Sequence, residues 1–104
     1  MQVEATTEKS ELAMSTESQT YWVTFFAKFS EGNGPFIRRL SRGYPALSKS
    51  EFRLSCYLRA GYSSREIAEN TGKSLRTVEN RRYRLRKKLP IQSHENLTVF
   101  LMKI

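Results

Sequence analysis

The sequence lacks the residues that most catalytic and metal sites require. It contains no aspartate, one cysteine (Cys56) and one histidine (His94) among 104 residues. A lone cysteine forms no internal disulfide, and two potential ligands are too few for a zinc site. Catalysis by paired carboxylates would depend on scattered glutamates alone. We therefore expect a protein that is not an enzyme, without catalytic residues, cofactor or metal.

Long hydrophobic runs are also missing. The most apolar stretch, residues 22–29, is interrupted by Thr24 and Lys28, so no transmembrane span is predicted. The N-terminus has neither the basic start nor the apolar stretch of a signal peptide, which favours a cytoplasmic protein without membrane contact. Residues 1–19 are rich in Ser, Thr and Glu and have few large apolar side chains. This composition predicts a disordered tail or linker.

Acidic residues are scarce outside that segment. The chain has 18 Lys and Arg against 10 acidic residues, and its formal net charge is +8. Residues 73–88 contain eight basic residues and one acidic residue, Glu79, which leaves a local net charge of +7. Such a concentration of positive charge indicates a polyanionic partner, above all nucleic acid.

The apolar residues recur at helical spacing, and no strand alternation is found. A first helix is predicted roughly over 18–31, and a short second helix begins at Pro35. Two capping boxes, Ser48 with Glu51 and Ser63 with Glu66, predict the starts of the next two helices. Glycines end both, Gly72 as a left-handed cap. A fifth helix begins after Ser74 and ends at Pro90, and Ser93 is predicted to cap a last helix.

The fourth and fifth helices have the layout of a helix-turn-helix, in which a short helix and a glycine-containing turn precede a recognition helix. The predicted apolar side of the fifth helix carries Leu75, Val78, Leu85 and Leu89. Its opposite side presents polar and basic side chains: Arg76, Asn80, Tyr83, Arg84 and Lys87. Such side chains can contact base edges and phosphates when a helix lies in the major groove of DNA.

Four motifs stand at fixed spacing in this region: Leu47-Ser48-x-x-Glu51, residues 60–68 (AGYSSREIA), Ser74-x-x-Thr77-Val78-Glu79 and residues 86–89 (RKKL). Together they resemble the LuxR/GerE-type DNA-binding domain of bacterial transcription regulators. The resemblance covers about residues 46–104. It implies an all-α, tetrahelical helix-turn-helix domain, here preceded by an aromatic-rich helical extension over residues 20–45. The extension and residues 82–86 are similar to the C-terminal regions of regulators from Bacteroides-like bacteria.

The resemblance also implies roles for individual residues. Base-edge readers fall on Glu79, Asn80 and Tyr83, where the family usually has Lys at position 79. A glutamate there can accept a hydrogen bond from the cytosine amino group. Phosphate contacts fall on Ser63, Ser64, Arg65, Thr77 and Lys87. The expected DNA-binding set is completed by Ser74, Arg76, Arg81 and Arg84.

Partners other than double-stranded DNA are also suggested. Family members often dimerise through the last helix, so a homodimer contact is expected there or on the aromatic extension, with the candidates Leu97, Phe100, Leu101, Trp22 and Phe26. The aromatic stripe is expected to pack on the first helix of the motif or on a second copy. An upstream sensor module is implied by the resemblance. Arg82, on the apolar side of its helix, is expected to pair with Glu51 or Glu66 or to extend its charged end to the surface.

Two alternative functions remain at this point. A sigma-factor-like promoter-recognition module would use the same helix-turn-helix but depend on RNA polymerase. A protein-interaction module would use the aromatic N-terminal helices as its main surface, and its charge would serve solubility only.

Overall fold

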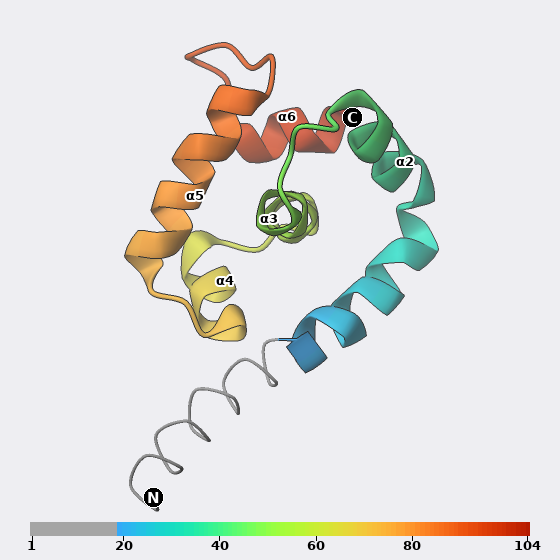
Figure 1. Ribbon diagram of the computed structural model, residues 1–104, viewed down its shortest axis with the longest axis vertical. Helices are drawn as coiled ribbons and strands as arrows, with labels where there is room; N and C mark the ends of the chain where they lie inside the picture. Colours follow the sequence, from blue (N-terminus) through green and yellow to red (C-terminus); the bar gives the residue numbers. More distant parts are fainter. Residues whose placement is uncertain (1–18) are drawn as a thin grey trace, which may run out of the picture.

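The computed structural model describes residues 19–104, which are helical apart from short connections (Figure 1). The predicted tail lies, except for its last residue, outside the described residues. The two predicted N-terminal helices are confirmed as residues 19–32 and α2 (Gly34–Gly43). Pro35 lies in the first turn of α2, where its missing N–H leaves no hydrogen bond unmade.

A capping box starts α3 (Lys49–Arg59), as the sequence predicts. The Ser48 hydroxyl oxygen accepts a hydrogen bond from the Glu51 N–H at 3.2 Å, and the Glu51 carboxylate accepts one from the Ser48 N–H at 2.8 Å. The two bonds satisfy N–H groups that the helix itself leaves without partners. The chain turns after α3 at Gly61, whose φ of 94° favours glycine.

The second capping box starts α4 (Ser64–Thr71) in the same way. The Ser63 hydroxyl accepts from the Glu66 N–H at 3.1 Å, and the Glu66 carboxylate accepts from the Ser63 N–H at 2.8 Å. Gly72 ends α4 in the left-handed conformation, with φ at 73°. This prediction of a glycine cap is therefore confirmed.

The recognition helix of the predicted motif is α5 (Leu75–Lys88), and Ser74 caps it by accepting from the Thr77 N–H at 3.0 Å. Val78, Leu85 and Leu89 are buried, as the spacing predicts. Leu75 is 38% exposed, so its predicted place on the buried side is wrong. It is the first residue of α5 and lies a turn before the residues that reach the core.

The last helix, α6 (Leu97–Lys103), starts later than predicted. The predicted cap at Ser93 is wrong, because the side chain of Asn96 accepts from the Val99 N–H at 3.1 Å instead. Residues 92–95 form a separate turn in which the Glu95 N–H donates to the Gln92 carbonyl at 3.0 Å. The Glu95 carboxylate in turn accepts from the Gln92 N–H at 3.1 Å.

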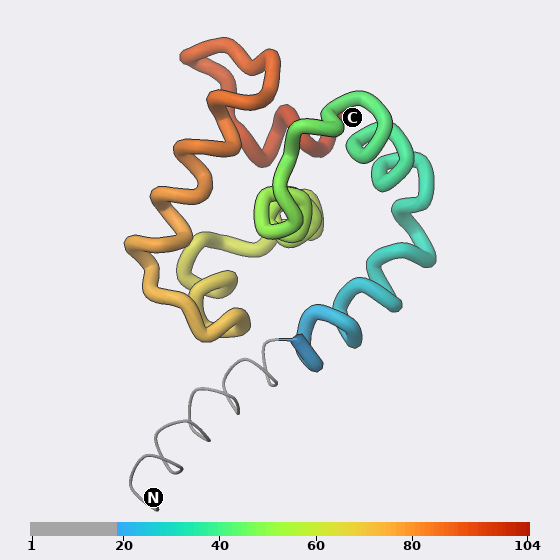
Figure 2. The backbone as a smooth tube through the Cα atoms, viewed as in Figure 1, coloured from blue at the N-terminus to red at the C-terminus, as the bar shows by residue number. Residues whose placement is uncertain are grey.

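The helices are arranged around α3, which packs on both α5 and α6, while α4 packs on α5 (Figure 1). Figure 2 shows that residues 19–32 and α2 curve around the side of α3 that lies away from α5. Helix α5 therefore occupies one edge of the molecule and α2 the opposite edge. No helix between residues 19 and 104 combines the length and the apolar character needed to cross a membrane.

The aromatic stripe of the first helix packs on α3, which is one of the two expected arrangements. The Trp22 and Phe25 ring centroids lie 5.6 and 4.6 Å from that of Tyr57. The hydroxyls of Tyr21 and Tyr62 are 2.7 Å apart and form a hydrogen bond. These contacts join the extension and the helix-turn-helix into one core.

Candidate nucleic-acid interface

The turn between α4 and α5 fixes the relation of the two helices. Gly72 adopts a backbone conformation that other residues rarely tolerate, and its N–H donates to the Ala68 carbonyl at 3.0 Å. Ile67 and Ala68 of α4 and Val78 of α5 are buried in the same core. With its inner side thus covered, α5 leaves its opposite side free.

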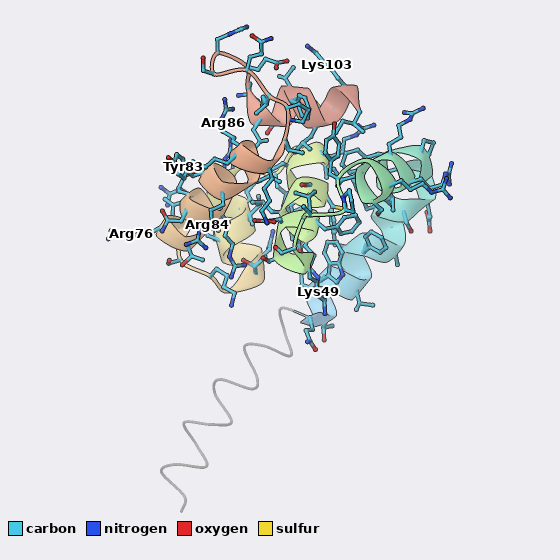
Figure 3. The ribbon with its side chains drawn as sticks, turned by 45° about the horizontal axis from the view of Figure 1, so that its top comes forward. Lys49, Arg76, Tyr83, Arg84, Arg86 and Lys103 are labelled. Carbon is cyan, nitrogen blue, oxygen red and sulfur yellow. The ribbon has the colours of Figure 1, made fainter. Side chains whose placement is uncertain are left out.

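The outer side of α5 is exposed, as predicted. Its five residues Arg76, Asn80, Tyr83, Arg84 and Lys87 all face solvent, and Tyr83 is 61% exposed. Figure 3 shows Arg76, Tyr83 and Arg84 along α5. The Lys87 ammonium lies 4.4 Å from the centroid of the Tyr83 ring, which is within cation–π range. The side thus combines cations with an aromatic ring and an amide.

Other cations of α5 are bound by the rest of the chain. Arg86 donates to the backbone carbonyls of Glu95 at 2.7 Å, Gln92 at 3.1 Å and Ser93 at 3.3 Å. It therefore fastens the turn before α6 to α5. An arginine used in this way is structural, although it is one of the eight basic residues counted over residues 73–88.

Lys88 joins α5 to the start of α3. Its ammonium lies 2.8 Å from the Glu51 carboxylate and donates to the Ala46 carbonyl at 3.2 Å. Burial alone would raise the pKa of Glu51, which is 6% exposed, but hydrogen bonds from Lys88 and Ser48 outweigh burial. The pKa of the Glu51 carboxyl is therefore held below its usual value.

Arg82 connects the two helices of the motif, and its predicted pairing with Glu51 or Glu66 is wrong. It donates to the Ser64 hydroxyl at 3.2 Å, and its Nε lies 3.9 Å from the Glu79 carboxylate. The expected partners are engaged elsewhere, Glu51 with Lys88 and Glu66 in the capping box of α4.

Glu79, predicted as a base-edge reader, lies close to the start of α4. The Ser64 hydroxyl donates to its carboxylate at 3.3 Å. The Glu79 side chain remains 57% exposed, so one carboxylate is accessible to a ligand while Arg82 partly neutralises it. The Ser64 hydroxyl therefore contacts both Glu79 and Arg82. Its predicted role as a phosphate contact did not include these two partners.

The other residues that were predicted to contact DNA lie in different places on α4 and α5. The hydroxyls of Ser63 and Ser74 cap α4 and α5, and the Ser74 hydroxyl also donates to that of Thr77 at 2.9 Å. Arg65 is exposed near the start of α4. Arg81 is half-buried and lines a cavity between the helices, away from the exposed side of α5. The sequence reasoning omitted Lys73, which is exposed in the turn directly before Ser74.

The predicted dimer contacts need correction at two positions. Leu97 is 2% exposed and Leu101 is 0% exposed within a single chain, so neither side chain is available to a partner. Trp22, Phe26 and Phe100 are half-buried and keep part of their surface accessible. On the outer side of α6, Val99 and Met102 are 47% and 50% exposed.

Comparison with known families agrees with this geometry. Residues 57–89 match the family described as Sigma-70, region 4, a helix-turn-helix DNA-binding module. The matched segment contains the end of α3 and all of α4 and α5. No curated protein and no solved structure matches the chain. The resemblance to the LuxR/GerE-type domain stays a prediction.

Proposed function

We propose that this chain binds double-stranded DNA with sequence specificity by placing α5 in the major groove. It acts as the DNA-binding domain of a bacterial transcription regulator of the LuxR/GerE type, in the cytoplasm and downstream of a sensor module. Its activity is binding, without turnover or cofactor. The observation that carries this proposal is the division of the cations of α5 into two groups.

One group is held by other parts of the molecule and the other is exposed on the outer side, whereas Arg81 lines the cavity and belongs to neither. Arg82, Arg86 and Lys88 are each bound by oxygen atoms of other helices or turns. Arg76 and Arg84 have no ion-pair or hydrogen-bond partner in the described part of the chain, and both are exposed. Charged side chains left without partners on one side of a helix are available to phosphates and base edges.

The free side chains also have the chemistry that base recognition requires. Asn80 can bond adenine through two atoms, and Arg76 and Arg84 can bond guanine or phosphate. Lys87 and the exposed Arg65 near the start of α4 extend this surface toward the phosphate backbone.

Two copies are needed for a long recognition sequence, because one helix reads only a few base pairs. We propose that the chain binds as a homodimer on two half-sites. Val99 and Met102, the exposed apolar residues of α6, together with the accessible part of Phe100, are the surface for this contact.

The proposal can be tested by selecting duplexes from a random pool and measuring affinity at about 50 and 200 mM salt. We expect steep loss of affinity with salt, and an equal loss on all sequences for Lys87→Ala. Arg42→Ala is the matched control, since Arg42 is exposed on α2 at the opposite edge. Absence of binding even at the lower salt concentration would contradict the proposal.

The match of residues 57–89 to Sigma-70, region 4 favours a second candidate function. In that case the chain recognises promoter DNA as a partner of RNA polymerase. The selected duplexes should then be bound tightly only when polymerase core enzyme is present. Tight binding by the chain alone favours the regulator.

A further inference from the structure

A cavity of about 430 Å³ lies beside α5, on the side away from its exposed face. Residues 19–32, α3, α4 and α5 all contribute to its walls. Its volume falls in the range of sites that hold small organic ligands. Neither the core nor the proposed DNA contacts account for this space.

The inner wall of the cavity is apolar and aromatic. Trp22 and Tyr57 supply two rings, and Leu54, Ile67 and Val78 supply aliphatic surface from three different helices. The three aliphatic residues are at most 4% exposed and therefore belong to the rigid core. Of the five residues named, Trp22 alone is not buried, so its ring is the main accessible apolar surface for the body of a ligand.

The rim of the cavity is positively charged. Lys49, Arg53, Lys73 and Arg81 line it, and no acidic residue does. None of these four cations has an ion-pair or hydrogen-bond partner among residues 19–104. The Arg53 guanidinium lies 4.9 Å above the Trp22 ring, which connects the charged rim to the aromatic wall. Lys49 lies at the start of α3 in Figure 3.

The inner wall also carries one phenol, that of Tyr57. The Tyr57 hydroxyl forms no hydrogen bond in the described part of the chain, although the residue is only 3% exposed. Burial raises the pKa of Tyr57 to about 12, so the phenol keeps its proton at neutral pH. The phenol can therefore donate a hydrogen bond to an anionic oxygen.

We propose that this cavity binds a small amphipathic anion, namely an aromatic carboxylate or one with a medium-length alkyl chain. Its apolar part lies against Trp22 and Tyr57, and its carboxylate lies among the cations of the rim. A DNA phosphate would use the cations but would leave the apolar wall uncovered. The proposal concerns binding in the absence of DNA, so it does not depend on the proposed function.

The test is a titration of the full ¹⁵N-labelled chain, followed by amide chemical shifts. The probe is indole-3-propionate, compared with indole-3-propionamide, which lacks the charge, and with propionate, which lacks the ring. We expect saturable shifts around the cavity with indole-3-propionate. Indole-3-propionamide should bind about fivefold more weakly because it lacks the carboxylate that interacts with the rim cations. Propionate should bind at least about tenfold more weakly because it lacks the ring that contacts the apolar wall.

Paired variants then locate the site. The double variant Lys49→Ala/Lys73→Ala removes two exposed rim cations and should weaken indole-3-propionate binding about fivefold. The double variant Arg38→Ala/Arg42→Ala removes the same charge from α2 and should leave binding unchanged. Thermal unfolding of both variants shows whether the fold is kept.

Two results would overturn the proposal. The first is the absence of saturable shifts at millimolar probe. The second is equal binding of propionate and indole-3-propionate. This result would mean that the rim binds small anions through their charge alone and that the apolar wall contributes nothing.

Discussion

Arg84 and Arg86 stand two residues apart on α5, carry the same charge and should respond to alanine substitution in opposite ways. Arg84 is exposed and has no partner in the described residues. Arg86 is fastened to the carbonyls of the turn before α6. We expect Arg84→Ala to weaken DNA binding without changing stability, and Arg86→Ala to lower stability.

The size of the stability effect follows from the contacts of Arg86. A hydrogen bond from a charged donor contributes about 1.5–3 kcal/mol. The bond to the Glu95 carbonyl is the shortest, at 2.7 Å, and is partly buried, whereas the bonds to Gln92 and Ser93 are exposed. Counting only the first in full, we expect a loss of about 2 kcal/mol in the free energy of unfolding. For a domain of this size the melting temperature then falls by roughly 10 °C.

The effect on DNA binding is read from its salt dependence. If Arg84 contacts a phosphate, Arg84→Ala should make the slope of log K against log salt less steep by about 0.9. Its free energy of unfolding should stay within about 0.5 kcal/mol of the wild-type value. Urea denaturation and fluorescence anisotropy of labelled duplexes measure the two quantities. An unchanged unfolding midpoint for Arg86→Ala, or a lowered one for Arg84→Ala, would refute the conclusion that Arg86 stabilises the fold and that Arg84 does not.

Further changes test the core and its charges. The pKa of Glu51 is lowered in the folded state, so its stabilisation is present above the usual value near 4.5 and lost as the pH falls through the folded value. The stability difference between wild type and Glu51→Gln should therefore shrink between pH 7 and pH 3 in urea titrations. Cys56 is 0% exposed, and burial raises the pKa of its thiol to about 12. Iodoacetamide should therefore alkylate Cys56 only after the chain has unfolded globally. Fast labelling of the native chain would contradict this expectation. Phe36, 1% exposed, should lose about 3–5 kcal/mol of unfolding free energy on substitution by alanine, measured by chemical denaturation.

The helix starts were predictable where their signals are local. Each capping box joins two side chains three residues apart, Ser48 with Glu51 and Ser63 with Glu66, so the sequence alone specifies it. The exposed side of α5 was equally predictable, because the period of the helix places its polar residues together. Ser93 shows the limit of such signals, since Asn96 competes with it as a cap and the turn made by Glu95 decides the outcome.

Contacts between distant residues were not predictable in this way. Glu51 and Lys88 lie 37 residues apart in sequence, and only the packing of α3 on α5 brings them together. The same holds for Arg82, whose partners follow from the position of α4 on α5. The cavity likewise requires side chains from several helices to converge, which no spacing along one helix reveals.

The most direct test of DNA recognition by α5 is the affinity of Asn80→Ala for a selected duplex and for a scrambled one. We expect wild type to prefer the selected duplex by about 10³-fold or more. Asn80→Ala should reduce that preference by about tenfold and leave binding to the scrambled duplex unchanged, since Asn80 is exposed and contributes to base reading only. A variant that kept the full preference would contradict base recognition by this side of α5.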